Sequence, residues 1–218
     1  MKRQIVTTSD GSHSLYVPEL DEHYHSTHGA VQEARHVFIA MGLDYFPADQ
    51  DLRLLEVGLG TGLNLWLTLM ASAQRKGKIH YHGIEAFPLT LEEAQALNYP
   101  EVLQQPREIF LQLHATAWET PVDLAPQLEL LKQKALLQDV EFTQTYDIVY
   151  FDAFAPNRQP EMWKMAMLQK MCEALKPGGV WVTYCAKGQL RRDLKALGLQ
   201  VERLPGPPGK REMIRATK

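Results

Sequence analysis

A short run of β-favouring residues, 53–57, leads directly into a turn that contains three glycines, and this arrangement restricts the fold more than any other segment. Gly58, Gly60 and Gly62 supply a chain without Cβ atoms, which turns tightly and lets a ligand approach the backbone. Residues 63–73 then have the pattern of a helix. A strand, a glycine turn and a helix in this order begin an α/β unit, whose ligand binds at the turn.

Alternating strand and helix patterns continue along the rest of the chain. They predict a mostly parallel, three-layer sheet that ends in an antiparallel C-terminal strand pair. The Lys-Pro-Gly-Gly sequence at 176–179 is expected to stop the helix that precedes it. Predicted strands are 78–85, one within 131–139, 147–152, 180–185, and the terminal pair 199–204 and 211–217; predicted helices are 90–97, 161–175 and 189–197.

Composition points to an ordinary globular chain. With 218 residues, 45% of them hydrophobic, a single domain is expected, in which 51–218 form the core and 1–50 cover the active-site crevice. Two cysteines are too few for a disulfide framework, which favours a reducing cytoplasm. No secretion signal and no membrane-spanning run is apparent in the sequence, so a cytoplasmic protein without a membrane partner is predicted.

The details of the glycine turn distinguish between cofactors. A dinucleotide fingerprint requires a third glycine where Leu63 stands, and no Gly-Lys-Ser/Thr follows as in a phosphate-binding loop. The pattern Glu-x-Gly-x-Gly-x-Gly instead resembles the first motif of Rossmann-like S-adenosylmethionine-dependent methyltransferases. The cofactor contacts predicted in this segment are Glu56, Gly58, Gly60, Thr61, Gly62 and Asn64. A glycine-rich turn with a purely structural role is the alternative.

Two further acidic positions are candidates for holding a nucleoside. Glu85 ends the second predicted strand, where a carboxylate accepts hydrogen bonds from both ribose hydroxyls, with Ala86 beside it. Asp139 and Val140 would hold the adenine, through its exocyclic amine and its ring respectively. An acid at position 85 also suits a nicotinamide site, and an exposed aspartate at a strand end would explain Asp139 equally well.

Asp152 follows a strongly buried strand and is expected at the carboxyl edge of the sheet, beside the glycine turn. A carboxylate there accepts an N–H from an amine held in line with a sulfonium methyl group. It also raises the pKa of that amine, so burial or the sulfonium charge must counter this effect. Phe154 could pack against a planar base. A turn or capping aspartate is the alternative interpretation.

The residues 152–163 carry a specific resemblance. Their pattern Asp-Ala-Phe-Ala-Pro-x(4)-Glu-Met-Trp resembles the signature Asp-Gly-Phe-Ala-Pro-x(3)-Pro-Asp-Met-Trp of the methyltransferase half of the bifunctional tRNA 5-methylaminomethyl-2-thiouridine biosynthesis protein. Stretches at 24–38, 113–118 and 206–213 are similar to the same family and follow its order. The resemblance therefore covers nearly the whole chain.

The resemblance implies a reaction. The aminomethyl group of 5-aminomethyl-(2-thio)uridine at the tRNA wobble position would be methylated by S-adenosylmethionine, giving 5-methylaminomethyl-(2-thio)uridine and S-adenosylhomocysteine. Asp152 would be the catalytic residue, Glu85 the ribose acid and Asp139 the adenine acid. The flavin-dependent half of the family has no counterpart in these residues, so no flavin is expected, and separate enzymes would supply the aminomethyl precursor.

Charge is unevenly distributed although the net value is −3. Residues 187–218 contain nine basic and three acidic side chains, and such a segment could contact tRNA phosphates. Lys210 and Arg211, in a loop framed by glycine and proline, are the first candidates for this contact. A solvated surface without a partner is the alternative.

The N-terminal region contributes the remaining candidates. Tyr24 and Glu33 are predicted to line the amine pocket, and an ordinary N-terminal extension that covers a sheet edge is the alternative. His23, His25 and His28 are not expected to bind a metal, because methyl transfer from a sulfonium needs no Lewis acid. Two other functions stay open. A small-amine methyltransferase or polyamine aminopropyltransferase would also use an aspartate at a sheet edge, and a catalytically idle RNA-binding module would keep the basic segment.

Overall fold

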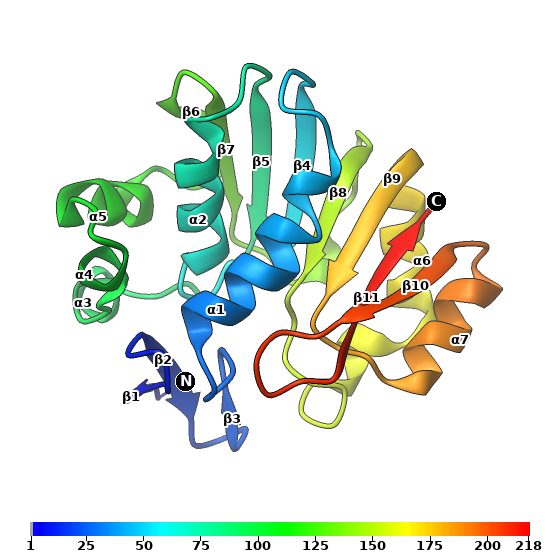
Figure 1. The fold of residues 1–218 in the computed structure, drawn as a ribbon, viewed down its shortest axis with the longest axis horizontal. Coiled ribbons are helices and arrows are strands. Elements are labelled where there is room, and N and C mark those ends of the chain that lie inside the picture. Colours follow the sequence, from blue (N-terminus) through cyan, green and yellow to red (C-terminus); the bar gives the residue numbers. More distant parts are fainter. Residues whose placement is uncertain (1) are drawn as a thin grey trace.

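The computed structural model describes residues 2–218, which form an eight-stranded sheet with helices on both faces and a separate three-stranded sheet (Figure 1). The order of the large sheet is β10-β11-β9-β8-β4-β5-β7-β6. Its five central strands, β9, β8, β4, β5 and β7, are parallel, whereas β6, β11 and β10 pair antiparallel with their neighbours. Its strands are β4 (Leu52–Val57), β5 (Ile79–Ile84), β6 (Val122–Ala125), β7 (Leu128–Gln133), β8 (Tyr146–Phe151), β9 (Leu175–Thr183), β10 (Gln200–Pro205) and β11 (Glu212–Thr217).

Alternation along the central strands creates two hydrophobic cores. In β8, Ile148 and Tyr150 face one core, while Val149 and Phe151 face the other. The first core contains residues of α1, α2, α4 and α5, and the second contains residues of α6 and α7. The helices are α1 (Ala30–Ala34), α2 (Leu63–Ser72), α3 (Leu91–Gln95), α4 (Tyr99–Leu103), α5 (Arg107–Ala115), α6 (Met165–Ala174) and α7 (Gly188–Ala196).

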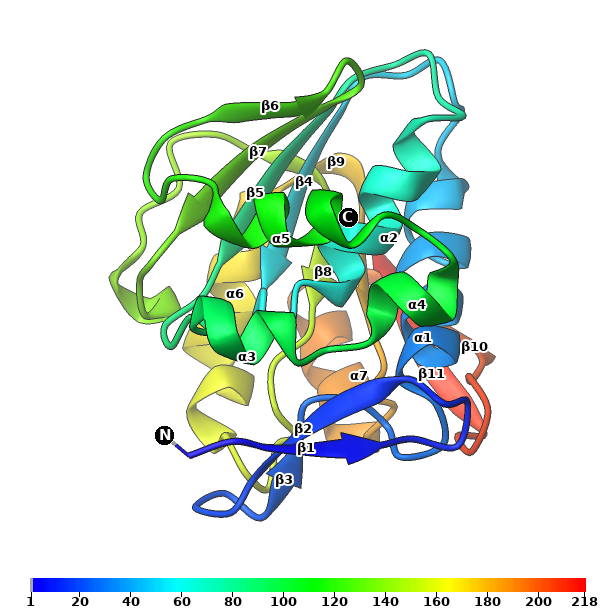
Figure 2. The same cartoon turned by 90° about the vertical axis from the view of Figure 1, so that its left-hand side faces the viewer.

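The N-terminal region lies across the ends of the parallel strands. Strands β1 (Gln4–Thr7), β2 (His13–Val17) and β3 (Glu22–His23) form the small antiparallel sheet. Figure 2 shows this sheet below the edge at which β4 and β5 end. A π-helical segment (Arg35–Ala40) continues α1 toward the large sheet, and a short 3-10 turn (Leu43–Tyr45) precedes β4.

The structure corrects three local predictions. The expected strand within 131–139 begins earlier, as β7, and Leu137–Asp139 is a 3-10 turn. The expected helix 161–175 is divided into a 3-10 turn (Pro160–Trp163) and α6, because Lys164 is extended. The indole of Trp163 donates to the carbonyl of Phe154 at 2.8 Å, which ties this first turn to the segment that follows β8.

The third correction concerns the Lys-Pro-Gly-Gly sequence. The helix ends before it, at Ala174, as predicted, but the sequence itself lies inside β9, which begins at Leu175 and not at the predicted residue 180. Gly178 adopts a φ of +77°, and its N–H donates to the carbonyl of Lys218 at 2.8 Å. The pairing register of β8 and β9 shifts between Tyr146 and Ile148. The glycine thus allows the irregular backbone at the start of β9. Helix α6 ends at Ala174, and β9 begins at the next residue.

Candidate functional site

The glycine turn connects β4 to α2 and is in close contact with two other segments. Gly58 has a φ of +86°, and a Cβ atom there would lie 2.8 Å from the carbonyl oxygen of Asp152. Gly60 has a φ of +49°, and a Cβ atom there would lie 3.0 Å from the ring of Tyr24. A positive φ and the lack of space both require glycine at these positions. The turn thus brings the N-terminal region and the end of β8 together.

A pocket opens beside this turn, and we call it the glycine-turn pocket. It lies at the carboxyl ends of the parallel strands, where α/β sheets bind their ligands. Its walls come from the ends of β4, β5 and β8, from the segment after β7 and from the N-terminal region. Its lining includes Val57, Gly58, Leu59, Gly60, Thr61, Leu63, Asn64, Ile84, Glu85, Ala86, Phe87, Ala135, Leu137, Asp152 and Phe154.

Glu85 presents its carboxylate to this pocket in a fixed orientation. One oxygen accepts the N–H of Gly60 at 2.8 Å, and the other accepts the N–H of Phe87 at 2.8 Å. Each carboxylate oxygen retains a further acceptor site, so two hydroxyl groups of a ligand could still donate to it. Next to Glu85, the side chains of Leu137 and Ala135 form an apolar part of the wall.

A buried polar chain lies beneath the pocket and supports Asp152. The amide nitrogen of Asn64 donates to Glu56 at 2.9 Å and to Asp152 at 2.8 Å. The hydroxyl of Tyr81 donates to the second oxygen of Glu56 at 2.7 Å. Because Glu56 is fully buried, its pKa is raised well above the usual range. One amide group of α2 therefore fixes two carboxyl groups from two adjacent strands.

Asp152 has the electrostatic environment of a proton acceptor. Burial raises its pKa to about 7, and the negative charge of Glu33 adds to this increase. The hydrogen bond from Asn64 and the positive charge of Lys210 act in the opposite direction. A carboxyl group whose pKa is near neutrality exchanges a proton readily at physiological pH.

A second pocket, which we call the Lys210 pocket, lies on the other side of Asp152. The ammonium group of Lys210 forms an ion pair with Glu33 and lies 4.0 Å from the centre of the Tyr184 ring. The Tyr184 hydroxyl donates to the carbonyl of Ala153 at 2.9 Å. The lining of the Lys210 pocket includes Glu22, His23, Tyr24, His25, Ser26, Thr27, Glu33, Asp152, Ala153, Phe154, Ala155, Tyr184 and Lys210.

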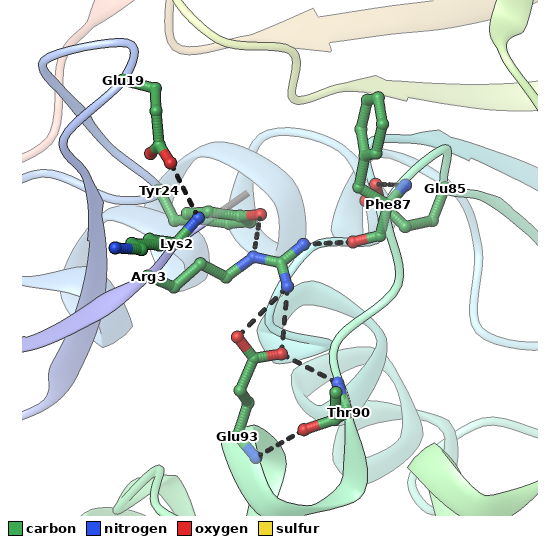
Figure 3. A network of polar contacts seen from close by, with 8 residues as sticks. All are labelled: Lys2, Arg3, Glu19, Tyr24, Glu85, Phe87, Thr90 and Glu93. Carbon is green, nitrogen blue, oxygen red and sulfur yellow. Dashed lines mark hydrogen bonds and ion pairs between the residues drawn. The ribbon is translucent and has the colours of Figure 1, made fainter.

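Arg3, the residue before β1, connects Tyr24 to the segment that follows β5 (Figure 3). Its guanidinium donates to the Tyr24 hydroxyl at 3.0 Å, to the Glu93 carboxylate at 3.0 and 3.2 Å, and to the carbonyl of Phe87. Glu93 also closes a capping box with Thr90 at the start of α3. Tyr24 and Phe87 both line the pocket, so this network connects two of its walls.

The structure brings most of the predicted site residues to the two pockets but not all of them. Glu56 is fully buried with both oxygens bonded, so it supports Asp152 and does not reach a ligand. Asp139 is exposed and Val140 is packed in the second core, and neither lines the glycine-turn pocket. Arg211 is exposed and lies outside the Lys210 pocket.

Lys210 also differs from its prediction. Its ammonium group faces Glu33 and Tyr184 inside the pocket, so it does not point outward to a phosphate backbone. Sequence reasoning missed Tyr184, although it follows the end of β9, and carboxyl ends of parallel strands form the ligand crevice. It also missed the contact between His25 and the Thr61 hydroxyl at 2.7 Å, for which no sequence signal existed. Burial lowers the pKa of His25 to about 4.

In residues 2–218, no helix combines the length and the apolar character that crossing a membrane requires.

Comparison with known proteins identifies the class to which this fold and site belong. The profile of one family of S-adenosyl-L-methionine-dependent methyltransferases matches residues 97–218, and the chain belongs to that family. The bifunctional protein MnmC for tRNA 5-methylaminomethyl-2-thiouridine biosynthesis from Cupriavidus necator is 33% identical over 93% of this chain and 32% of its own length. The protein of the same name from Magnetococcus marinus is 32% identical over 92% and 32%. The chain spans about a third of the length of these curated relatives.

Solved structures confirm the predicted methyltransferase fold. MNMC2 from Aquifex aeolicus superposes with a TM-score of 0.81 at 27% identity, covering 99% of this chain and 70% of that one. Spermidine synthase from Thermotoga maritima has a TM-score of 0.56 at 16% identity, covering 100% of this chain and 74% of that one, which shows a shared fold alone. The glycine-turn pocket fits the cofactor of the family, because it combines a cradle without Cβ atoms, the acceptor pair of Glu85 and an apolar wall.

Proposed function

We propose that this methyltransferase transfers a methyl group to the aminomethyl nitrogen of 5-aminomethyl-(2-thio)uridine at the wobble position of tRNA. One observation carries the proposal: Asp152 lines both the glycine-turn pocket and the Lys210 pocket. An acceptor in the wall between two pockets is where an amine and a methyl donor would meet. The names and similarity of the MnmC relatives support the choice of substrate.

The residues of the glycine-turn pocket would hold S-adenosylmethionine. Glu85 would accept hydrogen bonds from the ribose hydroxyls, and Leu137 with Ala135 would cover the adenine in place of Asp139 and Val140. Gly58 and Gly60 line the pocket with their backbone, whereas Gly62, predicted as a cofactor contact, does not line it and packs against His114. When bound, the cofactor supplies an electrophilic methyl group, which needs an uncharged amine in line with it.

Asp152 would take the proton that the amine must lose. With a pKa of about 7, its carboxylate accepts a proton from an approaching ammonium group more readily than an ordinary aspartate does. Asn64 holds the accepting group in place through its hydrogen bond of 2.8 Å. Phe154 and Tyr24, whose rings lie 5.1 Å apart in an edge contact, offer an aromatic wall for the uracil ring.

Nucleoside mass spectrometry tests the proposal directly. Purified protein and S-adenosylmethionine are incubated with tRNA that carries 5-aminomethyl-2-thiouridine. We expect this nucleoside to disappear and 5-methylaminomethyl-2-thiouridine to appear in equal amount. Binding of S-adenosylhomocysteine without any change in the nucleoside would refute the proposed substrate but would still support the assigned cofactor.

A small polyamine is the second candidate substrate. The carboxylates of Glu22, Glu33 and Asp152 all line the Lys210 pocket, and such a cluster suits an ammonium chain. Lys210 neutralises Glu33, and the guanidinium of Arg158 lies 3.9 Å from Glu22, which weakens this reading. Turnover of spermidine in the same assay, with no turnover of tRNA, would favour it.

A further inference from the structure

The positive charge near the C-terminus is gathered in one place, which we call the α7 hollow. Arg191, Arg192 and Lys195 of α7 line it together with Arg203 of β10. Within the part of the chain that the structure describes, no carboxylate is among its lining residues. Four cationic side chains around one depression make it a surface that attracts polyanions.

Like charges are held close together in this hollow. A Cβ atom on Gly188 would lie 3.5 Å from a guanidinium nitrogen of Arg192 and 3.6 Å from one of Arg191, so both groups lie near the same point. That point is the first residue of α7, where unpaired backbone N–H groups add positive potential. Arg192 donates to the amide oxygen of Gln189 at 2.7 Å, and the nitrogen of that amide donates to Asp193 at 2.7 Å. Within residues 2–218, Arg203 is the only one of the four cations in an ion pair, with Glu212 at 3.2 Å. An anion would relieve this repulsion.

The hollow is close to the candidate active site. Tyr184 lines the Lys210 pocket, and Gly188 lines the hollow only four residues later. Four extended residues span at most about 14 Å. A phosphate near a base held in the Lys210 pocket could therefore reach the hollow.

We propose that the α7 hollow binds the phosphodiester backbone of the RNA, close to the base that enters the Lys210 pocket. This inference rests on the proposed function. Guanidinium groups match phosphate oxygens with paired hydrogen bonds, and adjacent phosphates supply the repeated charge that several arginines require. The hollow thus replaces Lys210 and Arg211 as the main phosphate contact.

Binding of an unmodified anticodon stem-loop RNA, measured against salt concentration, tests the hollow. The double variant Arg192→Gln with Lys195→Gln removes two exposed charges from it. The matched control, Arg53→Gln with Lys76→Gln, removes two exposed charges near the starts of β4 and β5, at the opposite edge of the sheet. Each lost phosphate contact lowers the salt slope by about 0.7 to 0.9. We expect a slope lower by about 1.5 in the hollow variant and an unchanged slope in the control.

The outcomes separate this inference from the proposed function. Equal salt slopes in the hollow variant and the wild type would refute the proposed contact between the hollow and the RNA backbone, even if the wild type methylates tRNA. A lower slope together with no methylation by the wild type would support the hollow and refute the substrate. Failure of the wild type to bind the RNA would overturn both. Unchanged affinity for S-adenosylhomocysteine in the two double variants verifies that they are folded.

Discussion

The two pockets on either side of Asp152 are built in different ways. The glycine-turn pocket is formed mainly by residues that directly follow parallel strands, such as Gly58 after β4 and Glu85 after β5. The Lys210 pocket depends on contacts between distant segments, such as the ion pair between Lys210 and Glu33, which lie 177 positions apart. Backbone geometry therefore shapes the first pocket, and side-chain pairing shapes the second.

This difference predicts that the two pockets respond separately to substitution. Changes in the turn should alter cofactor affinity, whereas changes in the Lys210 pocket should alter the use of the amine substrate. Asp152 lies between them and should affect catalysis without belonging to either binding reaction.

The largest effect is expected for Asp152→Asn. The amide cannot accept the proton of an ammonium group, so we expect turnover to fall by about 100- to 10,000-fold. Affinity for S-adenosylhomocysteine, measured by calorimetry, should stay within about threefold of the wild type, which corresponds to about 0.7 kcal/mol. Wild-type turnover by this variant on aminomethyl-bearing tRNA would exclude Asp152 from catalysis.

The next effect is on cofactor affinity. In Gly58→Ala the new methyl group meets the carbonyl of Asp152 at 2.8 Å, so the turn must move. We expect affinity for S-adenosylhomocysteine to fall by about tenfold or more, equal to about 1.4 kcal/mol. Gly198→Ala is the matched control, because Gly198 has a φ of +87° and nothing within 4 Å of the added atom. Both variants should lose about 1–3 kcal/mol of stability from backbone strain, but equal loss of affinity in both would contradict the role of the turn.

A smaller effect concerns the pH dependence of the reaction. Asn64 donates a hydrogen bond that lowers the pKa of Asp152, so Asn64→Ala should raise that pKa above its present value of about 7. As the pH falls, the carboxylate of Asp152 then becomes protonated at a higher pH than in the wild type. The acid limb of the kcat/KM profile should therefore move to higher pH by about one unit. Thr68→Val, one turn further along α2, controls for general loss of packing and should leave the profile in place. A downward movement in Asn64→Ala would show that Asn64 does not stabilise the carboxylate.

The smallest effect is expected for Lys210→Met. Loss of its ion pair releases Glu33, so KM for the tRNA substrate should rise by about three- to tenfold, while cofactor affinity is unchanged. Arg211→Met removes the same charge from the exposed neighbouring residue and should leave KM nearly unchanged. If both variants raised KM equally, the total charge of the loop would determine KM. The position of Lys210 inside its pocket would then have no specific role in substrate binding.

The sequence was sufficient for the features that depend on local backbone conformation. The glycine turn, the start of a helix at Thr90 and the position of Asp152 after β8 all follow from residue types within a few positions of one another. The prediction that Asp139 binds the adenine instead assumed a strand that extends to this residue. The chain turns earlier, after Gln133, and this turn places Leu137 on the pocket wall.

Features that depend on tertiary pairing were not predictable in this way. The direction of the Lys210 side chain is determined by Glu33 and Tyr184, and no spacing in the sequence relates these three residues. The same holds for Glu56, whose position in the motif predicts a contact with the cofactor. In the structure, both of its carboxylate oxygens accept hydrogen bonds from Asn64 and Tyr81.

The insertion of β11 between β9 and β10 has a consequence for the order in which the protein matures during translation. Residues 56–152, which include most of the lining of the glycine-turn pocket, are synthesised well before β11. The loop that carries Lys210 is fixed only when residues 212–217 join the sheet. A nascent chain therefore contains most residues of the pocket proposed for the methyl donor before it contains the strand that fixes Lys210 in the pocket proposed for the amine.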